Sequence, residues 1–310
     1  MAQPRIALAH RGPRSGGRWG RGYRWRAPPG AHHLDTPAAV LAVVLLEMAV
    51  GGSALLWWAP TWGAVRHGYE MLLGTTLGLM ALAAWAASRG PLAELSLAVD
   101  APAIRVTSAG VLVTATATFL AVAVLVLRHP GVARALGSLG TAAGIATLVA
   151  LAQVRGAAAG AGPTWRGVAE LLAGTYFLGA VWNGMVLGHW YLVERRLSNR
   201  YMVWMAWVNV GAVGAGLASV LLSATNPVPC AGLEGRALAL CRLRYSPLLS
   251  VGSVTVMMGA GLIVVIALIA AFNVKLAREG GRSIQASTGM FYLAVILAPA
   301  AEFAAKVRFF

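Results

Sequence analysis

Eight long apolar stretches constrain the fold of this chain more than any other feature of its sequence. A transmembrane helix needs about 20 mostly apolar residues to cross a hydrocarbon core of roughly 30 Å. The stretches that meet this requirement cover residues 37–58, 68–88, 107–127, 135–153, 167–192, 201–223, 247–274 and 284–304. They predict an all-α polytopic membrane protein, with about eight transmembrane helices in one bundle that spans residues 36–310.

The composition supports this fold class. Hydrophobic residues make up 58% of the 310 positions, charged residues make up 11%, and the mean hydropathy is +0.70. A soluble domain with so few charges would not stay in solution, whereas a bundle in lipid can carry them. The alternating decads of an outer-membrane β-barrel are absent, which leaves the helical class.

The first 35 residues differ sharply from the rest of the chain. They are rich in Arg, Gly and Pro and contain seven of the 25 basic residues. We expect residues 1–35 to be disordered or to lie on the membrane surface, because they offer no apolar core. Whether they belong to the mature protein is open. The other basic residues are spread through short loops, so the formal charge of +15 indicates membrane topology and contact with anionic lipid rather than nucleic acid.

The orientation rests on the tail. The loops on the tail's side and the loops on the opposite side each hold nine basic residues. The positive-inside rule therefore predicts, from the tail alone, cytoplasmic N- and C-termini in a bacterial plasma membrane. Cys230 and Cys241 point the other way, because a disulfide in their loop would belong on the oxidising side. The pairing of these cysteines and the oligomeric state stay open.

Two interruptions are expected among the spans. A polar connection from Ser88 to Arg105 should join the second and third spans, and Pro299 should interrupt the last one. Pairs of small residues four apart, such as Gly184 and Gly188, would let neighbouring helices pack closely.

Glu47 lies near the centre of the first span. An isolated carboxylate at that depth costs a few kcal/mol, so it should face the bundle interior and be paired or protonated. It is our candidate for a proton path, with a structural carboxyl group bonded to a neighbouring helix as the alternative. Glu170 and Glu302 are placed nearer the membrane face on the tail's side. Glu302 should form a helical ion pair with Lys306.

The helix from Tyr176 to Arg196 is the strongest candidate for the wall of a functional site. It carries the amide of Asn183 at its middle, and it ends in His189, Trp190 and Tyr191 before a charged turn. Interhelical hydrogen bonding would also explain Asn183. An imidazole can bind a metal, exchange protons or hydrogen-bond a quinone carbonyl, so His189 is the central candidate in this group.

Other histidines should lie on the same side of the membrane. His67 opens the second span, with Glu70 one turn away on the same helix face, and His129 follows the third span. No pair within one helix has metal-binding spacing, so no metal site is predicted. Histidines at helix ends also argue against a b-type haem, whose axial ligands face each other well inside a bundle.

The span count and the motif Gly188-His189-Trp190-Tyr191 resemble the NrfD-like membrane anchors of the polysulphide and DMSO reductase type. The segment Gln285 to Tyr292 is a second block of similarity. The resemblance implies a non-catalytic anchor subunit without a bound cofactor of its own. It would bind quinol at one membrane face and pass electrons to a partner that carries iron–sulfur clusters or haem. The short loops depart from the large docking surface that such a partner needs.

Three functions therefore remain in view. The first is a quinone-interacting subunit of a bacterial electron-transfer complex, with a pocket at the rim opposite the tail between the first, second and fifth spans. The second is a secondary transporter or channel, with Glu47 and Asn183 on a water-filled path. The third is a structural accessory subunit of a larger membrane complex. Motifs for ATP hydrolysis or protease chemistry are absent.

Overall fold

Residues 37–98, 102–159, 163–194, 196–226, 234–236, 239 and 252–309 are described by the computed structural model of this chain. Over these ranges the chain is helical, with turns between the helices and no strand. Eight of the helices are long and apolar enough to cross a membrane, which confirms the predicted fold class. Residues 1–35, Cys230 and Cys241 lie outside the described ranges, so the expectations about the tail and the cysteine pair are untested.

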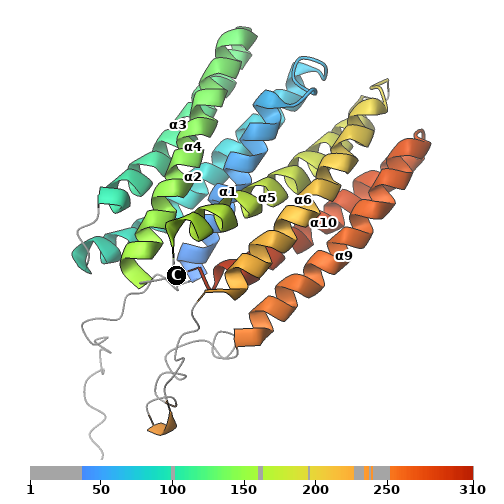
Figure 1. Ribbon diagram of the computed structural model, residues 1–310. Coiled ribbons are helices and arrows are strands. Elements are labelled where there is room, and N and C mark those ends of the chain that lie inside the picture. The colour runs from blue at the N-terminus through green and yellow to red at the C-terminus, as the bar shows by residue number, and fades with distance from the viewer. Residues whose placement is uncertain are drawn as a thin grey trace, which may run out of the picture. The chain divides into compact units, whose positions relative to one another are not determined.

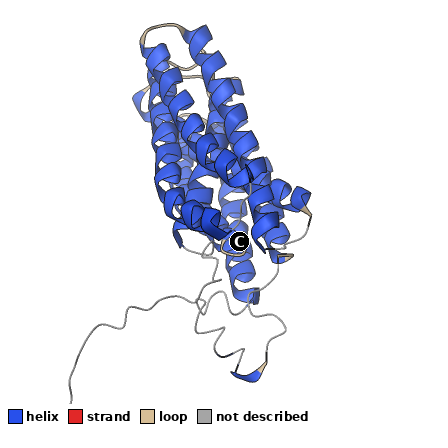
Figure 2. Cartoon of the chain, turned by 90° about the vertical axis from the view of Figure 1, so that its left-hand side faces the viewer, coloured by secondary structure: helices blue, strands red, loops and turns tan. Residues whose placement is uncertain are grey.

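The eight long helices alternate in direction (Figure 1). They are α1 (Pro37–Trp58), α2 (His67–Ala98), α3 (Pro102–Val126), α4 (Pro130–Ala159), α5 (Thr164–Val193), α6 (Arg200–Ala224), α9 (Gly252–Glu279) and α10 (Ser283–Lys306). We call the end of the bundle that holds Pro37 and Lys306 the N-terminal face, and the end that holds Trp58 and His67 the far face. Figure 2 shows the helices side by side along one common direction.

Both predicted interruptions of the helices are wrong. Helix α2 continues through Pro91 to Ala98, so only a short connection precedes α3. Helix α10 likewise runs through Pro299 to Lys306 without a break. Membrane helices tolerate an internal proline because neighbouring helices and local adjustments satisfy the backbone groups that it frees. By contrast, α1, α3 and α4 begin at a proline, which suits the first helical position.

Helices α1 and α5 form the centre of the bundle. Helix α1 packs against α2, α4, α5 and α10, and α5 also packs against α4, α6 and α10. The two central helices are in backbone contact at Gly51 and Gly179, since a Cβ atom at Gly51 would lie 1.8 Å from the Thr175 carbonyl oxygen. Gly184 and Gly188 give the same close approach to α10, where they face Phe291 and Thr288. This confirms the role expected of the small residues.

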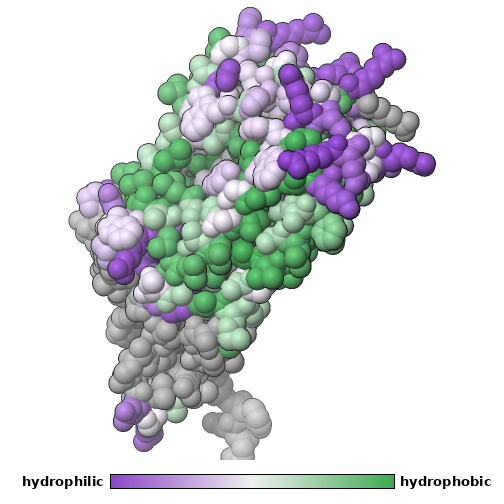
Figure 3. Space-filling model, turned by 45° about the vertical axis from the view of Figure 1, so that its right-hand side comes forward, coloured by the Kyte–Doolittle hydropathy of each residue, from purple (hydrophilic) through white to green (hydrophobic). Residues whose placement is uncertain are grey.

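The outer surface matches a lipid environment. Apolar side chains cover the middle of the face in Figure 3, and hydrophilic side chains project from its upper end. Large apolar side chains such as Leu268 and Ile296 are more than half exposed. The far face carries many basic residues in the loops and in the adjoining turns of the helices, namely Arg66, Arg128, Arg134, Arg200, Lys275, Arg278 and Arg282. An apolar middle with a basic rim is what a polytopic membrane protein presents to lipid.

Candidate functional site

Lys306, the last residue of α10, lies at the centre of a buried group of charges. Its Nζ is 3.2 Å from Glu47 Oε1 on α1, 3.1 Å from Glu302 Oε2 and 3.6 Å from Glu170 Oε1 on α5. All four side chains are at most 1% exposed. The hydroxyl of Ser219 on α6 joins them, because it donates to Glu302 Oε2 at 2.9 Å and accepts from Lys306 Nζ at 2.9 Å.

A second layer surrounds these residues on the N-terminal face. Arg155 at the end of α4 lies 3.6 Å from Glu170 Oε2 and donates to the amide oxygen of Asn226. The Asn226 amide in turn donates to Glu170 Oε2 at 3.1 Å. The guanidinium of Arg155 also lies over the ring of the buried Phe309, 4.8 Å from its centroid. The chain end after α10 therefore covers the cluster from this side.

Arg308 completes this layer. It donates to the Asn226 carbonyl oxygen at 2.8 Å and is 8% exposed. Burial lowers the pKa of the Arg308 guanidinium, and the nearby negative charge of Glu170 partly offsets this. An arginine stays protonated in a protein despite such a shift. We call Glu47, Glu170, Glu302, Lys306, Arg155 and Arg308 the buried charge cluster.

The buried charge cluster is balanced when every member is ionised, with three carboxylates and three cations. Burying a charge is expensive unless it is paired, and removing one partner from a buried pair typically costs about 3–5 kcal/mol. A hydrophobic replacement of the whole group is often as stable as the ion pairs themselves. Ionisable residues inside a membrane bundle are therefore expected to serve ion or proton pathways rather than stability alone.

The sequence identified this cluster only in part. The expectation that Glu47 faces the interior and is paired is confirmed by its contact with Lys306. The predicted ion pair between Glu302 and Lys306 is confirmed as well. The sequence placed Glu170 and Glu302 near the membrane face on the tail's side, but it did not predict that both are buried around the ammonium that also contacts Glu47. Arg155 lies just after the apolar stretch 135–153, and α4 continues past it.

A groove of about 270 Å³ opens on the side of the bundle next to this cluster. It lies between α1, α4, α5 and α6, with Gly51 and Thr175 among its lining residues and the aromatic rings of Trp58, Tyr176 and Trp204 along it. Trp58 Nε1 donates to Ser138 Oγ on α4 at 3.0 Å. We call this hollow the lateral groove. Its residues belong to the middle and the far half of the membrane-spanning helices.

A thin wall separates the lateral groove from the buried charge cluster. On α5, Thr175 lines the groove while its neighbour Gly174 faces the cluster. A Cβ atom at Gly174 would lie 2.8 Å from Glu47 Oε1 and 2.9 Å from Glu302 Oε2. On α1, Gly51 lines the groove one helical turn after Glu47.

His67 and Glu70 form a pair at the far face, as their spacing predicted. His67 Nδ1 lies 3.0 Å from Glu70 Oε2, and the Gly63 backbone amide donates to Glu70 Oε1 at 2.7 Å. Glu70 is fully buried, whereas the His67 side chain is 62% exposed. The Glu70 carboxylate therefore fixes the loop between α1 and α2.

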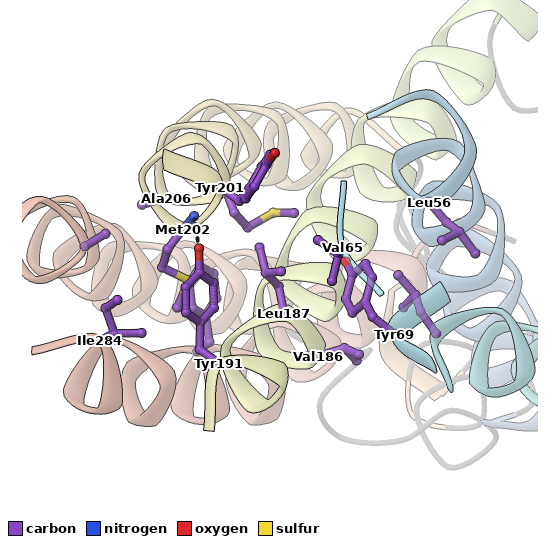
Figure 4. Packing of buried hydrophobic residues seen from close by; sticks show 14 of the residues in the cluster. Leu56, Val65, Tyr69, Val186, Leu187, Tyr191, Tyr201, Met202, Ala206 and Ile284 are labelled. Atoms are coloured by element: carbon purple, nitrogen blue, oxygen red, sulfur yellow. Dashed lines mark hydrogen bonds between the residues drawn. The ribbon is translucent and has the colours of Figure 1, made fainter. Parts of the chain in front are cut away.

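The His189-Trp190-Tyr191 motif is divided among three neighbours. His189 Nδ1 lies 3.0 Å from the hydroxyl of Tyr292 on α10, at an exposed position. Trp190 packs toward α2, with its ring 6.2 Å from that of Tyr69. The Tyr191 hydroxyl donates to the Ser198 carbonyl oxygen at 2.5 Å and accepts from the Met202 amide at 3.3 Å, and Figure 4 shows it pointing toward α6.

Tyr191 also borders a wide hollow of about 730 Å³ at the far face. Asn199, Arg282 and Gln285 supply most of its polar lining. This hollow lies between the ends of α5, α6 and α10, and the lateral groove involves α1, α4, α5 and α6. Neither position is the pocket between the first, second and fifth spans that the sequence suggested.

Asn183 lies in the closed centre of the bundle. Its Nδ2 donates to the Gly52 carbonyl oxygen on α1 at 3.1 Å and to the Gly179 carbonyl oxygen on its own helix at 2.8 Å. It is fully buried, and this pairing is the interhelical bond that was the alternative for it. Neither Asn183 nor Glu47 lines the lateral groove or the hollow at the far face.

Within the described residues, no three His, Cys, Asp or Glu side chains are grouped so that they could hold a metal ion. The chain matches no family model, no curated protein and no solved structure.

Proposed function

We propose that this protein is an integral membrane subunit that binds a quinone in the lateral groove and exchanges protons through the buried charge cluster. It would belong to an electron-transfer complex of a bacterial plasma membrane, in which a partner subunit supplies or accepts the electrons. One observation carries the proposal: an aromatic groove on the side of the bundle lies one helical turn from a buried carboxylate, that of Glu47.

The chemistry of quinones requires both parts. A quinone is dissolved in the lipid, so its site must be open to the side of the bundle, and small-molecule sites are mostly apolar with a few polar groups. The rings of Trp58, Tyr176 and Trp204 suit a flat ring ligand. Reduction of a quinone takes up protons together with electrons, and the Lys306 ammonium could pass a proton on through the carboxylates of Glu47 and Glu302 beside Gly174. With cytoplasmic termini, these protons would come from the cytoplasm.

Tryptophan fluorescence tests the groove, because a bound quinone quenches indoles that it touches. Decylubiquinone should quench the purified protein saturably. Ala54→Leu, which adds volume inside the groove, should weaken the binding about tenfold, equivalent to roughly 1.4 kcal/mol. Ala83→Leu, on an exposed position of α2, is the matched control and should bind like the wild type. Equal quenching in all three proteins would show that the quinone does not bind in the lateral groove.

The rim histidine provides a second comparison. If the groove binds the quinone, His189→Ala should leave the quenching unchanged, because His189 faces Tyr292. If the quinone instead binds at the far face, His189→Ala should abolish both the quenching and quinol-dependent reduction in membranes.

A secondary transporter is the second candidate, and the buried charge cluster itself favours it. Three carboxylates around one lysine form an arrangement that can gain or lose a cation with little change in shape. Transport would require a conformation in which water reaches Glu47. In proteoliposomes, a proton gradient should drive the uptake of a solute or cation. Loss of this uptake in Glu47→Gln, with uptake kept in Glu94→Gln, would support a transporter over a quinone-binding subunit.

A further inference from the structure

We infer that the oxygen atoms around Lys306 Nζ form a site for a monovalent metal cation, which the lysine ammonium occupies in this conformation. Carboxylate oxygens of Glu302, Glu47 and Glu170 lie 3.1, 3.2 and 3.6 Å from Nζ. The Ser219 hydroxyl at 2.9 Å and the Glu170 carbonyl oxygen at 3.4 Å complete the shell. Carboxylate, carbonyl and hydroxyl oxygens are the ligands that hard cations prefer.

A separate observation shows unused capacity for a cation in this shell. Glu47 Oε2 and Glu302 Oε1 are buried and accept no hydrogen bond from the described residues. Buried carboxylate oxygens normally have hydrogen-bond partners, so such atoms call for an explanation. A metal ion in the shell could draw on both oxygens of each carboxylate, which a single ammonium does not.

The charges of the cluster select the class of cation. The three carboxylates are balanced by Lys306, Arg155 and Arg308. If Lys306 gives its proton to water and one monovalent ion takes the place of the ammonium, the net charge is unchanged. A divalent ion would leave one uncompensated positive charge in a buried site, which is costly. The cluster should therefore exchange one proton for one Na⁺ or K⁺.

The surroundings allow this exchange. Lys306 is the last residue of α10, and its flexible four-carbon stem can withdraw without a change in the rest of the helix. Gly174 has no side chain between α5 and the oxygens of Glu47 and Glu302, so the backbone of α5 lies directly against them. The inference does not depend on quinone binding, and it would give the second candidate function its substrate.

Proton release tests the exchange directly. The purified full chain, in weakly buffered detergent with a pH indicator, should release up to one proton per chain when NaCl or KCl is added, and none when choline chloride is added. The release should saturate, persist in Glu94→Gln, whose carboxylate is exposed on α2, and weaken at least tenfold in Glu47→Gln. Equal release with choline, or none with either metal salt, overturns the inference. Comparison of the two salts shows which ion is preferred.

The lysine variant separates a cation site from a purely structural cluster. Lys306→Met removes the competing ammonium, so it should bind ²²Na⁺ or ⁸⁶Rb⁺ more tightly than the wild type without releasing a proton. Ser219→Ala removes one ligand but keeps Lys306 and the three carboxylates, so it should bind more weakly, and it provides the comparison if Lys306→Met does not fold. Binding of neither isotope to any of these proteins contradicts the site. Decylubiquinone quenching, measured on the same samples, reports on the groove independently.

Discussion

Lys306 Nζ lies 3.2 Å from Glu47 Oε1, so that the end of the last helix is joined to the middle of the first. Glu47 is the eleventh of the 22 residues of α1, and Lys306 is the final residue of α10. The same ammonium also contacts Glu170 on α5, so that Lys306 joins three helices. The arrangement of α1, α5 and α10 therefore depends on charges that are all out of contact with water.

Replacing Lys306 by Met should destabilise the protein strongly. Three carboxylates would then share the interior with Arg155 and Arg308 only, and breaking a buried pair costs about 3–5 kcal/mol. The double variant Lys306→Met/Glu47→Gln should recover part of this loss, because it restores the charge balance. Thermal melting of the purified proteins measures both effects, with Glu94→Gln as the control that should melt like the wild type. A double variant less stable than Lys306→Met alone would contradict a direct interaction between the two residues.

The hydropathy of the sequence was sufficient to predict the eight helices, since a span requires only length and apolar composition. Glu47 could be singled out because a lone carboxylate in an apolar run has no other explanation than a partner or a proton. Its partner could not be found in the same way. Lys306, Glu170 and Arg155 lie near the ends of their apolar runs, where charged residues ordinarily reach water.

The lateral groove was equally hidden from the sequence. It depends on how closely α1, α4 and α5 pack, and the approach of α1 to α5 is set by small residues that meet, such as Gly51 and Gly179. Glycines are frequent throughout the spans, so their sequence positions did not reveal which pairs touch. The rim motif at His189 was recognised as a group, but its three side chains turn toward different helices because successive residues on a helix point about 100° apart.

Gly51→Ala should be poorly tolerated. The added Cβ atom would lie 1.8 Å from the Thr175 carbonyl oxygen, which belongs to the backbone of α5 and cannot turn away. The loss should be at least the roughly 1–3 kcal/mol of an overpacked core. Gly214 on α6 is the matched control, because a Cβ atom there meets nothing within 4 Å. Gly214→Ala should keep or slightly raise the melting temperature, and equal losses in the two variants would contradict the close crossing of α1 and α5.

Glu70→Ala should loosen the loop between α1 and α2. The buried carboxylate accepts a hydrogen bond from the Gly63 amide at 2.7 Å and contacts His67 at 3.0 Å. Leaving such groups without a partner costs about 1–3 kcal/mol. Glu194 offers a contrast, because its ion pair with Arg66 involves a largely exposed guanidinium. Glu194→Gln should cost less than about 1 kcal/mol. Hydrogen exchange of the loop and thermal melting would compare Glu70→Ala with Glu194→Gln. If Glu70→Ala left the protection of the loop unchanged, the role of Glu70 in holding the loop would be refuted.

Two buried asparagines should respond differently to replacement by leucine. Asn183 links α5 to α1 through the Gly52 carbonyl oxygen at 3.1 Å, whereas neither amide atom of the fully buried Asn209 on α6 has a hydrogen-bond partner among the described residues. Interhelical hydrogen bonds in membranes contribute about 0.6 kcal/mol on average and up to about 1.7 kcal/mol. Asn183→Leu should therefore lower the melting temperature, while Asn209→Leu should leave it unchanged or raise it, because an unpaired buried amide is removed. If Asn209→Leu lowered the melting temperature more than Asn183→Leu, Asn209 would have to bind a partner beyond the described residues, such as a ligand held by α6.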